Sequence, residues 1–171
     1  MPFFTVIIPA YNRREMLKNA VDSVLAQSDS DFELIVVDDG SDDGTSGLID
    51  GYAGRIKYIY QQNSGVSSAR NRGIAVSNSP YITLLDSDDT WHKDKLIRHR
   101  EFIKNNPRIS IHQTEDIWIR KGVRVNPRLK HQKPQGRIFM QSLQLCMISP
   151  SSVCISKDIF EKYGMFDEKS M

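Results

Sequence analysis

The sequence predicts an α/β protein, with an open, mixed but mainly parallel sheet, helices on both faces and a hairpin in the C-terminal portion. Two observations over the first hundred residues predict this class. Short apolar runs alternate with amphipathic runs, and the strand expected at 33–37 is continuously apolar after Glu33, as in a parallel strand covered on both sides. Repeated strand–helix units imply right-handed crossovers and parallel strands. The 171 residues fit one domain, and 39% apolar residues are enough for a core.

The first four strands are expected at 4–8, 33–37, 56–60 and 81–85. Helices are expected from a capping-box-like pair, Asn12 and Glu15, near 48–52, after Gly65 and over 93–105. The first helix has apolar positions at helical spacing: Leu17, Ala20, Val21, Val24 and Leu25. The helix after Gly65 has a predicted buried stripe of Val66, Ala69, Gly73 and Ile74, and the helix at 93–105 is predicted to be amphipathic from Leu96, Ile97, His99, Arg100 and Ile103.

The pattern changes after Pro107. Two short runs, at 117–120 and 123–125, flank Lys121-Gly122 and predict a hairpin. The segments that follow are expected to be a basic loop at 126–136, a helix at 137–146, a strand at 152–155 and a short helix at 157–163. We therefore divide the single domain into a βα portion, 1–106, and a smaller, incomplete portion, 107–171.

Composition excludes several classes. No apolar run approaches the roughly 20 residues that span a bilayer, and the N-terminus has no basic leader. Two cysteines, Cys146 and Cys154, fit a reducing compartment, with Cys154 as a small buried hydrophobe. The four histidines have no metal-like spacing with the cysteines and are expected to be surface or partly buried residues: His92, His99, His112 and His131. We expect a cytoplasmic protein, and nothing in the pattern indicates an oligomeric state.

The charge is unevenly distributed, although the total is only +2. Seven basic residues and no acid lie between Arg120 and Arg137. This stretch is interpreted either as a solvated loop or as a contact with an anionic membrane surface or a phosphorylated acceptor. Nucleic acid is disfavoured as a partner, because only Trp118 could stack on a base among these cations.

Unusual residues follow three of the expected strands. Pro9-Ala-Tyr-Asn12 follows the first, Asp38-Asp39 the second and Asp86-Ser-Asp-Asp89 the fourth. Because ligands of open α/β sheets bind outside the carboxyl ends of the strands, these clusters predict one site at one sheet edge. Turns alone explain a single acidic cluster, but two acidic clusters and an aromatic residue on one edge favour a ligand.

The Asp86-x-Asp88 spacing favours a metal. In an extended segment, residues i and i+2 point the same way, and two close carboxylates are costly to ionise without a cation between them. Hard ions such as Mn²⁺ and Mg²⁺ take such oxygen ligands together with substrate phosphates. The glycine motifs of P-loop and dinucleotide-binding proteins are missing, so a nucleotide here would rely on metal and side chains. Tyr11 could stack on a base or ribose, and Arg70 could offset phosphate charge.

Four ordered motifs resemble the family 2 glycosyltransferases of the GT-A fold, and a later segment resembles their acceptor side. The motifs are Thr5-Val-Ile-Ile-Pro-Ala-Tyr-Asn-Arg13, Val37-Asp-Asp-Gly-Ser-x-Asp-Gly-Thr45, Gly65-x-x-x-Ala-Arg-Asn-x-Gly73 and Leu84-Leu-Asp-Ser-Asp-Asp89, and the later segment runs from Ser149 to Glu168. The resemblance implies an inverting transfer from a nucleotide diphosphosugar, commonly a UDP-sugar, to a saccharide or lipid-linked acceptor in cell-surface polysaccharide synthesis. It makes 1–106 the donor-binding portion and 107–171 the acceptor-side portion, at the cytoplasmic face of a membrane.

The resemblance also implies residue roles. Pro9, Ala10, Tyr11 and Asp39 would hold the base and ribose, Arg70 would lie near the nucleotide, and Asp86 near the ribose and metal. Asp88 would be the principal ligand of Mn²⁺ or Mg²⁺. The full set expected at the donor is Pro9, Ala10, Tyr11, Asn12, Asp39, Arg70, Asp86 and Ser87.

The catalytic base is the departure from the family pattern. An acidic pair usually follows the Gly-x-Phe-Asp-Glu segment, whereas this sequence ends at Met171, so the base is expected beyond it. Asp167 is the nearest acid but belongs to the preceding motif. Three functions stay open at this point: a glycosyltransferase, a donor-binding module without turnover, and a metal-dependent nucleotidyl or phosphoryl transferase.

Overall fold

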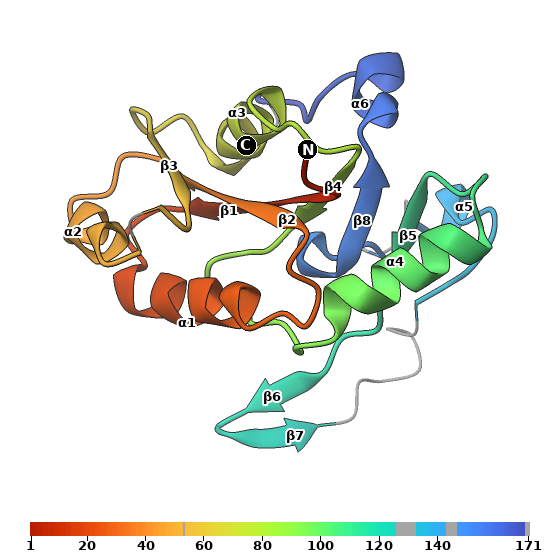
Figure 1. Ribbon diagram of the computed structural model, residues 1–171, viewed down its shortest axis with the longest axis horizontal. Coiled ribbons are helices and arrows are strands. Elements are labelled where there is room, and N and C mark those ends of the chain that lie inside the picture. Colours follow the sequence, from red (N-terminus) through yellow and green to blue (C-terminus); the bar gives the residue numbers. More distant parts are fainter. Residues whose placement is uncertain (53, 126–132, 143–146, 170–171) are drawn as a thin grey trace.

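The computed structural model describes residues 1–52, 54–125, 133–142 and 147–169. Over these residues, six strands form one sheet in the order β3-β2-β1-β4-β8-β5 (Figure 1). The first four strands are parallel, β8 is antiparallel to β4, and β5 is antiparallel to β8. The bounds are β1 Phe4–Ala10, β2 Phe32–Asp38, β3 Lys57–Tyr60, β4 Tyr81–Leu84, β5 Ile111–Gln113 and β8 Val153–Ser156. The predicted mixed, mainly parallel sheet is confirmed.

Helices cover both faces of the sheet, as predicted (Figure 1). One apolar cluster packs α1, α2 and α4 on one face, and a second packs α3 and α6 on the other. The helices are α1 Arg14–Leu25, α2 Thr45–Asp50, α3 Val66–Ala75, α4 Lys95–Asn105, α5 Phe139–Ser142 and α6 Asp158–Tyr163, with a 3₁₀ turn at Pro150–Ser152. The predicted hairpin is confirmed as β6 Trp118–Arg120 paired with β7 Val123–Val125.

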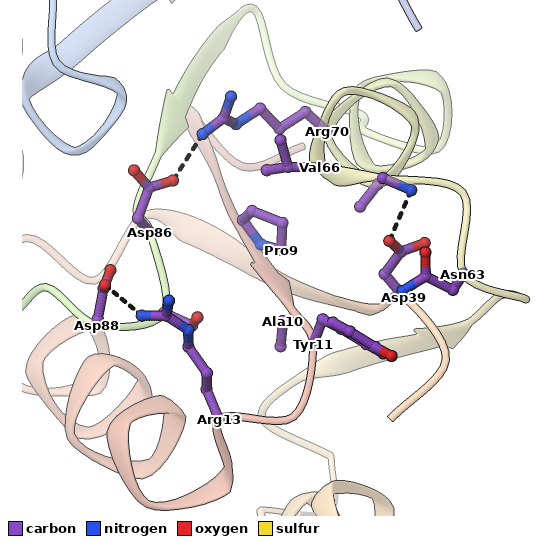
Figure 2. A pocket seen from close by; sticks show the side chains of 13 residues that line it. Pro9, Ala10, Tyr11, Arg13, Asp39, Asn63, Val66, Arg70, Asp86 and Asp88 are labelled. Carbon is purple, nitrogen blue, oxygen red and sulfur yellow. Dashed lines mark hydrogen bonds and ion pairs between the residues drawn. The ribbon is translucent and has the colours of Figure 1, made fainter. Parts of the chain in front are cut away.

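Strand β1 is the centre of the core, because it pairs with β2 and β4 and all seven of its residues are buried. Its Ile7 faces α3 so closely that a Cβ on Gly73 would lie 2.5 Å from Ile7 Cγ2. Gly73 therefore lets α3 pack directly on the strand. This packing holds the N-terminal end of α3 beside the carboxyl ends of β1, β2 and β4, around the cavity drawn in Figure 2.

The first helix starts differently from the prediction. It begins at Arg14, and no side chain at its N-cap makes a capping hydrogen bond. Asn12 Oδ1 instead accepts a hydrogen bond from Asp42 N at 2.9 Å, and Asp43 Oδ2 accepts one from Arg14 N at 2.8 Å. The capping box was wrong because a carboxylate from the loop after β2 supplies the cap, and this partner lies 29 residues away in the sequence.

The structure also contains a strand that was not predicted and exposes one residue that was expected to be buried. Strand β5 was missed because it has only three residues, and β8 supplies its hydrogen-bonding partner. Val66, expected in a buried helix stripe, is 45% exposed. Within the predicted helix at 137–146 only α5 is described; 143–146, with Cys146, lie outside the described residues, as do 126–132 of the basic loop.

The two portions of the chain contribute to the same sheet. Strands β5 and β8, both from 107–171, extend the sheet beyond β4. The division at residue 106 stays a prediction. In the part of the chain that the structure describes, every helix is too short or too polar to cross a membrane.

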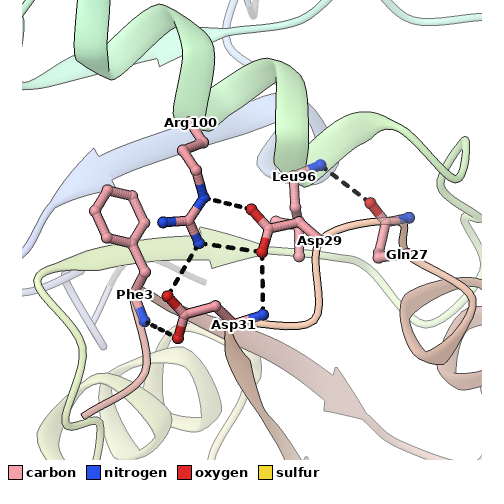
Figure 3. A network of polar contacts seen from close by, with 6 residues as sticks. All are labelled: Phe3, Gln27, Asp29, Asp31, Leu96 and Arg100. Carbon is pink, nitrogen blue, oxygen red and sulfur yellow. Dashed lines mark hydrogen bonds and ion pairs between the residues drawn. The ribbon is translucent and has the colours of Figure 1, made fainter.

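A polar network ties α4 to the loop between α1 and β2 (Figure 3). The Arg100 guanidinium donates to Asp29 and, at 3.2 Å, to Asp31, and it lies 4.1 Å from the centre of the Phe3 ring. Gln27 Oε1 accepts a hydrogen bond from Leu96 N at 3.0 Å near the start of α4. Burial raises the pKa of Asp29, but the hydrogen bonds and charge of Arg100 outweigh burial and hold it below the usual value.

We expect Arg100→Met to lower the free energy of unfolding by about 2–3 kcal/mol at pH 7, because it leaves the largely buried Asp29 carboxylate without its cation. The Asp29 pKa is lowered in the folded state, so this stabilisation is complete above about pH 4 and is lost as the pH falls through the lowered pKa. Urea denaturation at pH 7 and in acid measures both effects. Lys104→Met, an exposed position on the same helix, is the control, and equal losses in the two variants would contradict the prediction.

Candidate active site

A cavity of about 510 Å³ opens at the carboxyl ends of β1, β2 and β4. Figure 2 shows the side chains that line it. The lining set is Pro9, Ala10, Tyr11, Arg13, Asp39, Asn63, Gly65, Val66, Ala69, Arg70, Asp86, Ser87 and Asp88. The structure therefore brings together all the residues that the sequence placed at the donor and metal, except Asn12.

Asp39 lies at one end of the cavity. It is buried, and its Oδ1 accepts hydrogen bonds from Gln61 Nε2 at 2.7 Å and Ser64 N at 2.9 Å, while its Oδ2 accepts one from Gly65 N at 2.8 Å. The carboxylate therefore fixes the loop before α3 as well as facing the cavity. Tyr11, half exposed, stands on the same side as Asp39 in Figure 2. This end of the cavity therefore combines a carboxylate acceptor with an aromatic ring.

Asp86 and Asp88 lie at the other end, and each is paired with an arginine (Figure 2). Arg70 Nη2 donates to Asp86 Oδ1 at 2.7 Å from the first turns of α3, and Arg13 donates to Asp88 from the turn after β1. The Asp86–Arg70 pair is partly buried, whereas both members of the Arg13–Asp88 pair are about half exposed. Arg70 Nε is buried and has no partner among the described residues. This end therefore combines two carboxylates with two guanidinium groups.

The carboxylates fit the implied metal. Burial raises the pKa of Asp89, and the nearby charges of Asp88 and Asp86 add to the shift, so the segment concentrates negative charge. The oxygen donors of Asp86 and Asp88 suit Mn²⁺ or Mg²⁺. Asp88 is the more accessible of the two, but a metal there has to displace Arg13.

Two groups of site residues were missed from the sequence. Arg13 lies within the first motif, and Asn63, Gly65, Val66 and Ala69 surround the start of the third. The Gly65 motif was the available signal, because a helix that starts at a cavity brings its first residues to the wall. Asn12, in contrast, lies outside the cavity lining and joins the β1 end to the loop after β2 through Asp42 N and Ser41 Oγ.

Asn71 anchors the C-terminal segment. Its Nδ2 donates to Phe166 O at 2.9 Å and to Glu168 Oε1 at 2.7 Å, while its Oδ1 accepts a hydrogen bond from Phe166 N at 3.0 Å. Two of the predicted motifs, almost a hundred residues apart, therefore meet beside the cavity. Asp167 is exposed and outside the lining set, and its Oδ1 accepts a hydrogen bond from Lys169 N. Its role as a base is untested.

The basic stretch is divided between two environments. Arg120, Lys121 and Arg124 are exposed on the β6–β7 hairpin. Lys133, however, is only 11% exposed at its side chain, where Nζ lies 2.8 Å from Asp116 Oδ2 and 3.1 Å from Ser152 Oγ. Lys133 is therefore a structural cation, which corrects its inclusion in a solvated loop.

The chain belongs to glycosyl transferase family 2, whose family model matches residues 5–164. TuaG of Bacillus subtilis, a glycosyltransferase assigned to teichuronic acid biosynthesis, is 42% identical over 106 residues, which cover 60% of this chain and 42% of TuaG. The chain spans between 24% and 54% of the length of the curated relatives that match almost all of it.

Solved structures share the fold. S. aureus TarS 1-349 in complex with UDP has a TM-score of 0.80 at 23% identity, over 98% of this chain and 51% of that one. The mannosyltransferase PcManGT from Pyrobaculum calidifontis, in complex with GDP-Man and Mn²⁺, has a TM-score of 0.74 at 17% identity, over 98% of this chain and 48% of that one. The predicted GT-A fold is therefore confirmed.

Proposed function

We propose that this chain is the donor-binding part of an inverting, metal-dependent glycosyltransferase that uses a UDP-sugar. The observation that carries the proposal is the cavity that joins Asp39 and Tyr11 at one end to Asp86 and Asp88 at the other, in a family 2 chain. The complexes of TarS with UDP and of PcManGT with GDP-Man and Mn²⁺ support a nucleotide donor and a divalent ion. The likeness to TuaG supports a saccharide or lipid-linked acceptor in cell-surface polysaccharide synthesis.

In this proposal each group of cavity residues contacts a different part of the donor. Asp39 accepts a hydrogen bond from the base, Tyr11 packs on the base or ribose, and Pro9 and Ala10 form the wall beneath. Arg13 and Arg70, already aimed at the carboxylate end, face the diphosphate. Ser87 and Asp86 lie next to the ribose and the metal.

Asp86 and Asp88 would hold Mn²⁺ or Mg²⁺. When bound, such an ion stabilises the negative charge that builds on the departing nucleoside diphosphate. Arg13 and Arg70 would add positive charge at the same place. We place the base that deprotonates the acceptor hydroxyl in the acidic pair expected beyond Met171, since Asp167, the nearest acid, is not among the residues that line the cavity.

Titration of UDP into the chain with and without Mn²⁺, followed by assays with UDP-sugars, tests this proposal. We expect UDP to bind at least about tenfold more tightly with Mn²⁺, because metal and diphosphate neutralise each other. Binding without sugar transfer identifies a donor-binding part, and lengthening the chain through the acidic pair should then restore transfer. Undetectable UDP binding with Mn²⁺, or turnover of a nucleoside triphosphate, would contradict the proposal.

We also propose that the β6–β7 hairpin touches an anionic membrane at the cytoplasmic face. Exposed Ile119 and Val123 stand beside the cations Arg120 and Arg124 on this hairpin. At about 1 kcal/mol for each basic residue, the double variant Arg120→Glu and Arg124→Glu should weaken binding to anionic vesicles by roughly 30-fold or more. Co-sedimentation with anionic and neutral vesicles measures this, and unchanged binding to anionic vesicles would refute the contact.

A further inference from the structure

Three side chains that are distant in the sequence meet between α4 and the β5–β8 edge of the sheet. His112 and Cys154 are register partners on the antiparallel strands β5 and β8, so their side chains share one face. Helix α4, which runs beside these strands in Figure 1, adds His99. One ligand atom from each of the three lies within 4.8 Å of the others. The expectation of surface or partly buried histidines without a metal-like arrangement was wrong for His99, which is buried, and for the grouping of His99 and His112 with Cys154.

The hydrogen-bonding groups of this cluster are incompletely used. His99 Nδ1 and His112 Nε2 are 2.9 Å apart, so one ring donates and the other accepts. Among the described residues, the opposite nitrogens, His99 Nε2 and His112 Nδ1, are buried without partners, and His99 is only 1% exposed. A single hydrogen bond uses the lone pair of one ring. An ion between the rings would use a lone pair from each.

The protonation of the cluster favours a metal. Burial, helped by the charge of Lys95, lowers the pKa of His99 to about 2 and that of His112 to about 4. Both rings are therefore neutral at pH 7, which is the form that binds metals. Burial raises the pKa of the Cys154 thiol to about 12, so metal binding has to release the thiol proton to solvent.

We propose that His99, His112 and Cys154 form a Zn²⁺ site that is separate from the carboxylates of the donor cavity. Two imidazoles and a thiolate suit Zn²⁺ and disfavour Mn²⁺ and Mg²⁺, which prefer oxygen. The fourth position of a tetrahedral ion would be left to water, and His112 is the one partly exposed residue of the three. The ion would fasten α4 to the last two strands of the sheet.

Lys95 is a nearby cation whose positive charge would repel a Zn²⁺ ion bound at this cluster. Its Nζ donates to Thr114 Oγ1 at 2.7 Å and to Ser152 O at 3.3 Å, and it lies 5.1 Å from the centre of the Trp91 ring. Burial lowers the pKa of Lys95 to about 8. Lys95 can therefore give up its proton near neutral pH when a dication binds beside it, while the thiolate removes one further positive charge.

Cobalt titration of the chelator-stripped Asp88→Ala chain tests the site, because that background removes a ligand of the donor-cavity metal. We expect one Co²⁺ per chain with a thiolate-to-cobalt charge-transfer band that Zn²⁺ displaces. Cys154→Ser should abolish the band, and His112→Ala should weaken Co²⁺ binding by at least about 100-fold. Zn²⁺ should also raise the melting temperature of the starting chain and not that of these variants.

Two matched variants keep the test specific. Cys146→Ser and His92→Ala replace the other cysteine and an exposed histidine, and both should retain the band. The proposal would be overturned if the folded Asp88→Ala chain showed no thiolate-to-cobalt band, or if folded His112→Ala in that background kept the band unchanged. Either result can be obtained even if Cys154→Ser fails to fold. UDP binding by the wild-type chain is independent of these outcomes, so a failure here leaves the proposed donor site unaffected.

Discussion

Asp88→Ala should remove the gain in UDP affinity that Mn²⁺ provides, while leaving the weaker metal-free binding in place. Loss of groups that only support metal ligands costs about 10–100-fold in metal affinity, so loss of the principal ligand should cost about 100-fold or more. The carboxylate of Asp88 is about half exposed and, among the described residues, forms an ion pair with the half-exposed Arg13, so we expect the ion to bind first at this residue. Calorimetric titration of UDP at saturating and zero Mn²⁺ measures the difference.

Two variants control this result. Asp89→Asn changes the adjacent carboxyl, which lies outside the cavity lining, and should keep the metal-dependent gain. Arg13→Ala frees Asp88 from its competing cation, so Mn²⁺ alone should bind more tightly, although UDP loses a cationic contact. Full retention of the metal-dependent gain in folded Asp88→Ala would refute the metal assignment.

Asp39→Asn should weaken UDP binding by about 10–100-fold and lower the free energy of unfolding by about 1–3 kcal/mol. The reason is the same for both effects. Both Asp39 oxygens already accept hydrogen bonds from Gln61, Ser64 and Gly65, and an amide places an NH₂ group against one of these donors. The loop before α3 then shifts, and the acceptor for the base is lost or misplaced.

The two effects of Asp39→Asn are separated by measuring them independently. UDP titration gives the affinity, and urea denaturation gives the stability. Asp42→Asn, an exposed position three residues along the same turn, should change neither by more than a small amount. A stable Asp39→Asn chain with wild-type UDP affinity would show that Asp39 only supports the loop and does not contact the nucleotide.

Much of the fold could be predicted because the hydrophobic period changes clearly between elements. The continuous run in β2 and the spaced apolar residues of α1 identify a buried strand and an amphipathic helix without further information. Strand β5 could not be found in this way, since three residues give too short a pattern. The exposure of Val66 has a different cause: its position opens onto the cavity, which periodicity does not indicate.

The site could be predicted where its residues follow strands, because parallel strands bring their carboxyl ends together. Pro9, Asp39 and Asp86 were placed on one rim by this rule alone. This rule does not predict contacts between residues that are distant in the sequence and meet only in the folded structure. The hydrogen bond from Arg13 to Asp88 joins residues 75 positions apart, and the hydrogen bonds between Asn71 and Phe166 join residues 95 positions apart. The meeting of His99 with His112 and Cys154 needed the register of β5 against β8.

The pairing of Asp86 with Arg70 and of Asp88 with Arg13 has a consequence for the order in which nucleotide and ion bind. The carboxylate end of the cavity is locally balanced, because the two negative side chains of Asp86 and Asp88 face the two positive side chains of Arg70 and Arg13. A divalent ion that binds without nucleotide displaces an arginine from its aspartate, and that arginine is left without an anionic partner. A diphosphate that binds without the ion is repelled by the carboxylates of Asp86 and Asp88. When both bind together, the carboxylates pair with the ion and the arginines pair with the diphosphate, so every charge keeps a partner of opposite sign. We therefore expect nucleotide and ion to bind cooperatively.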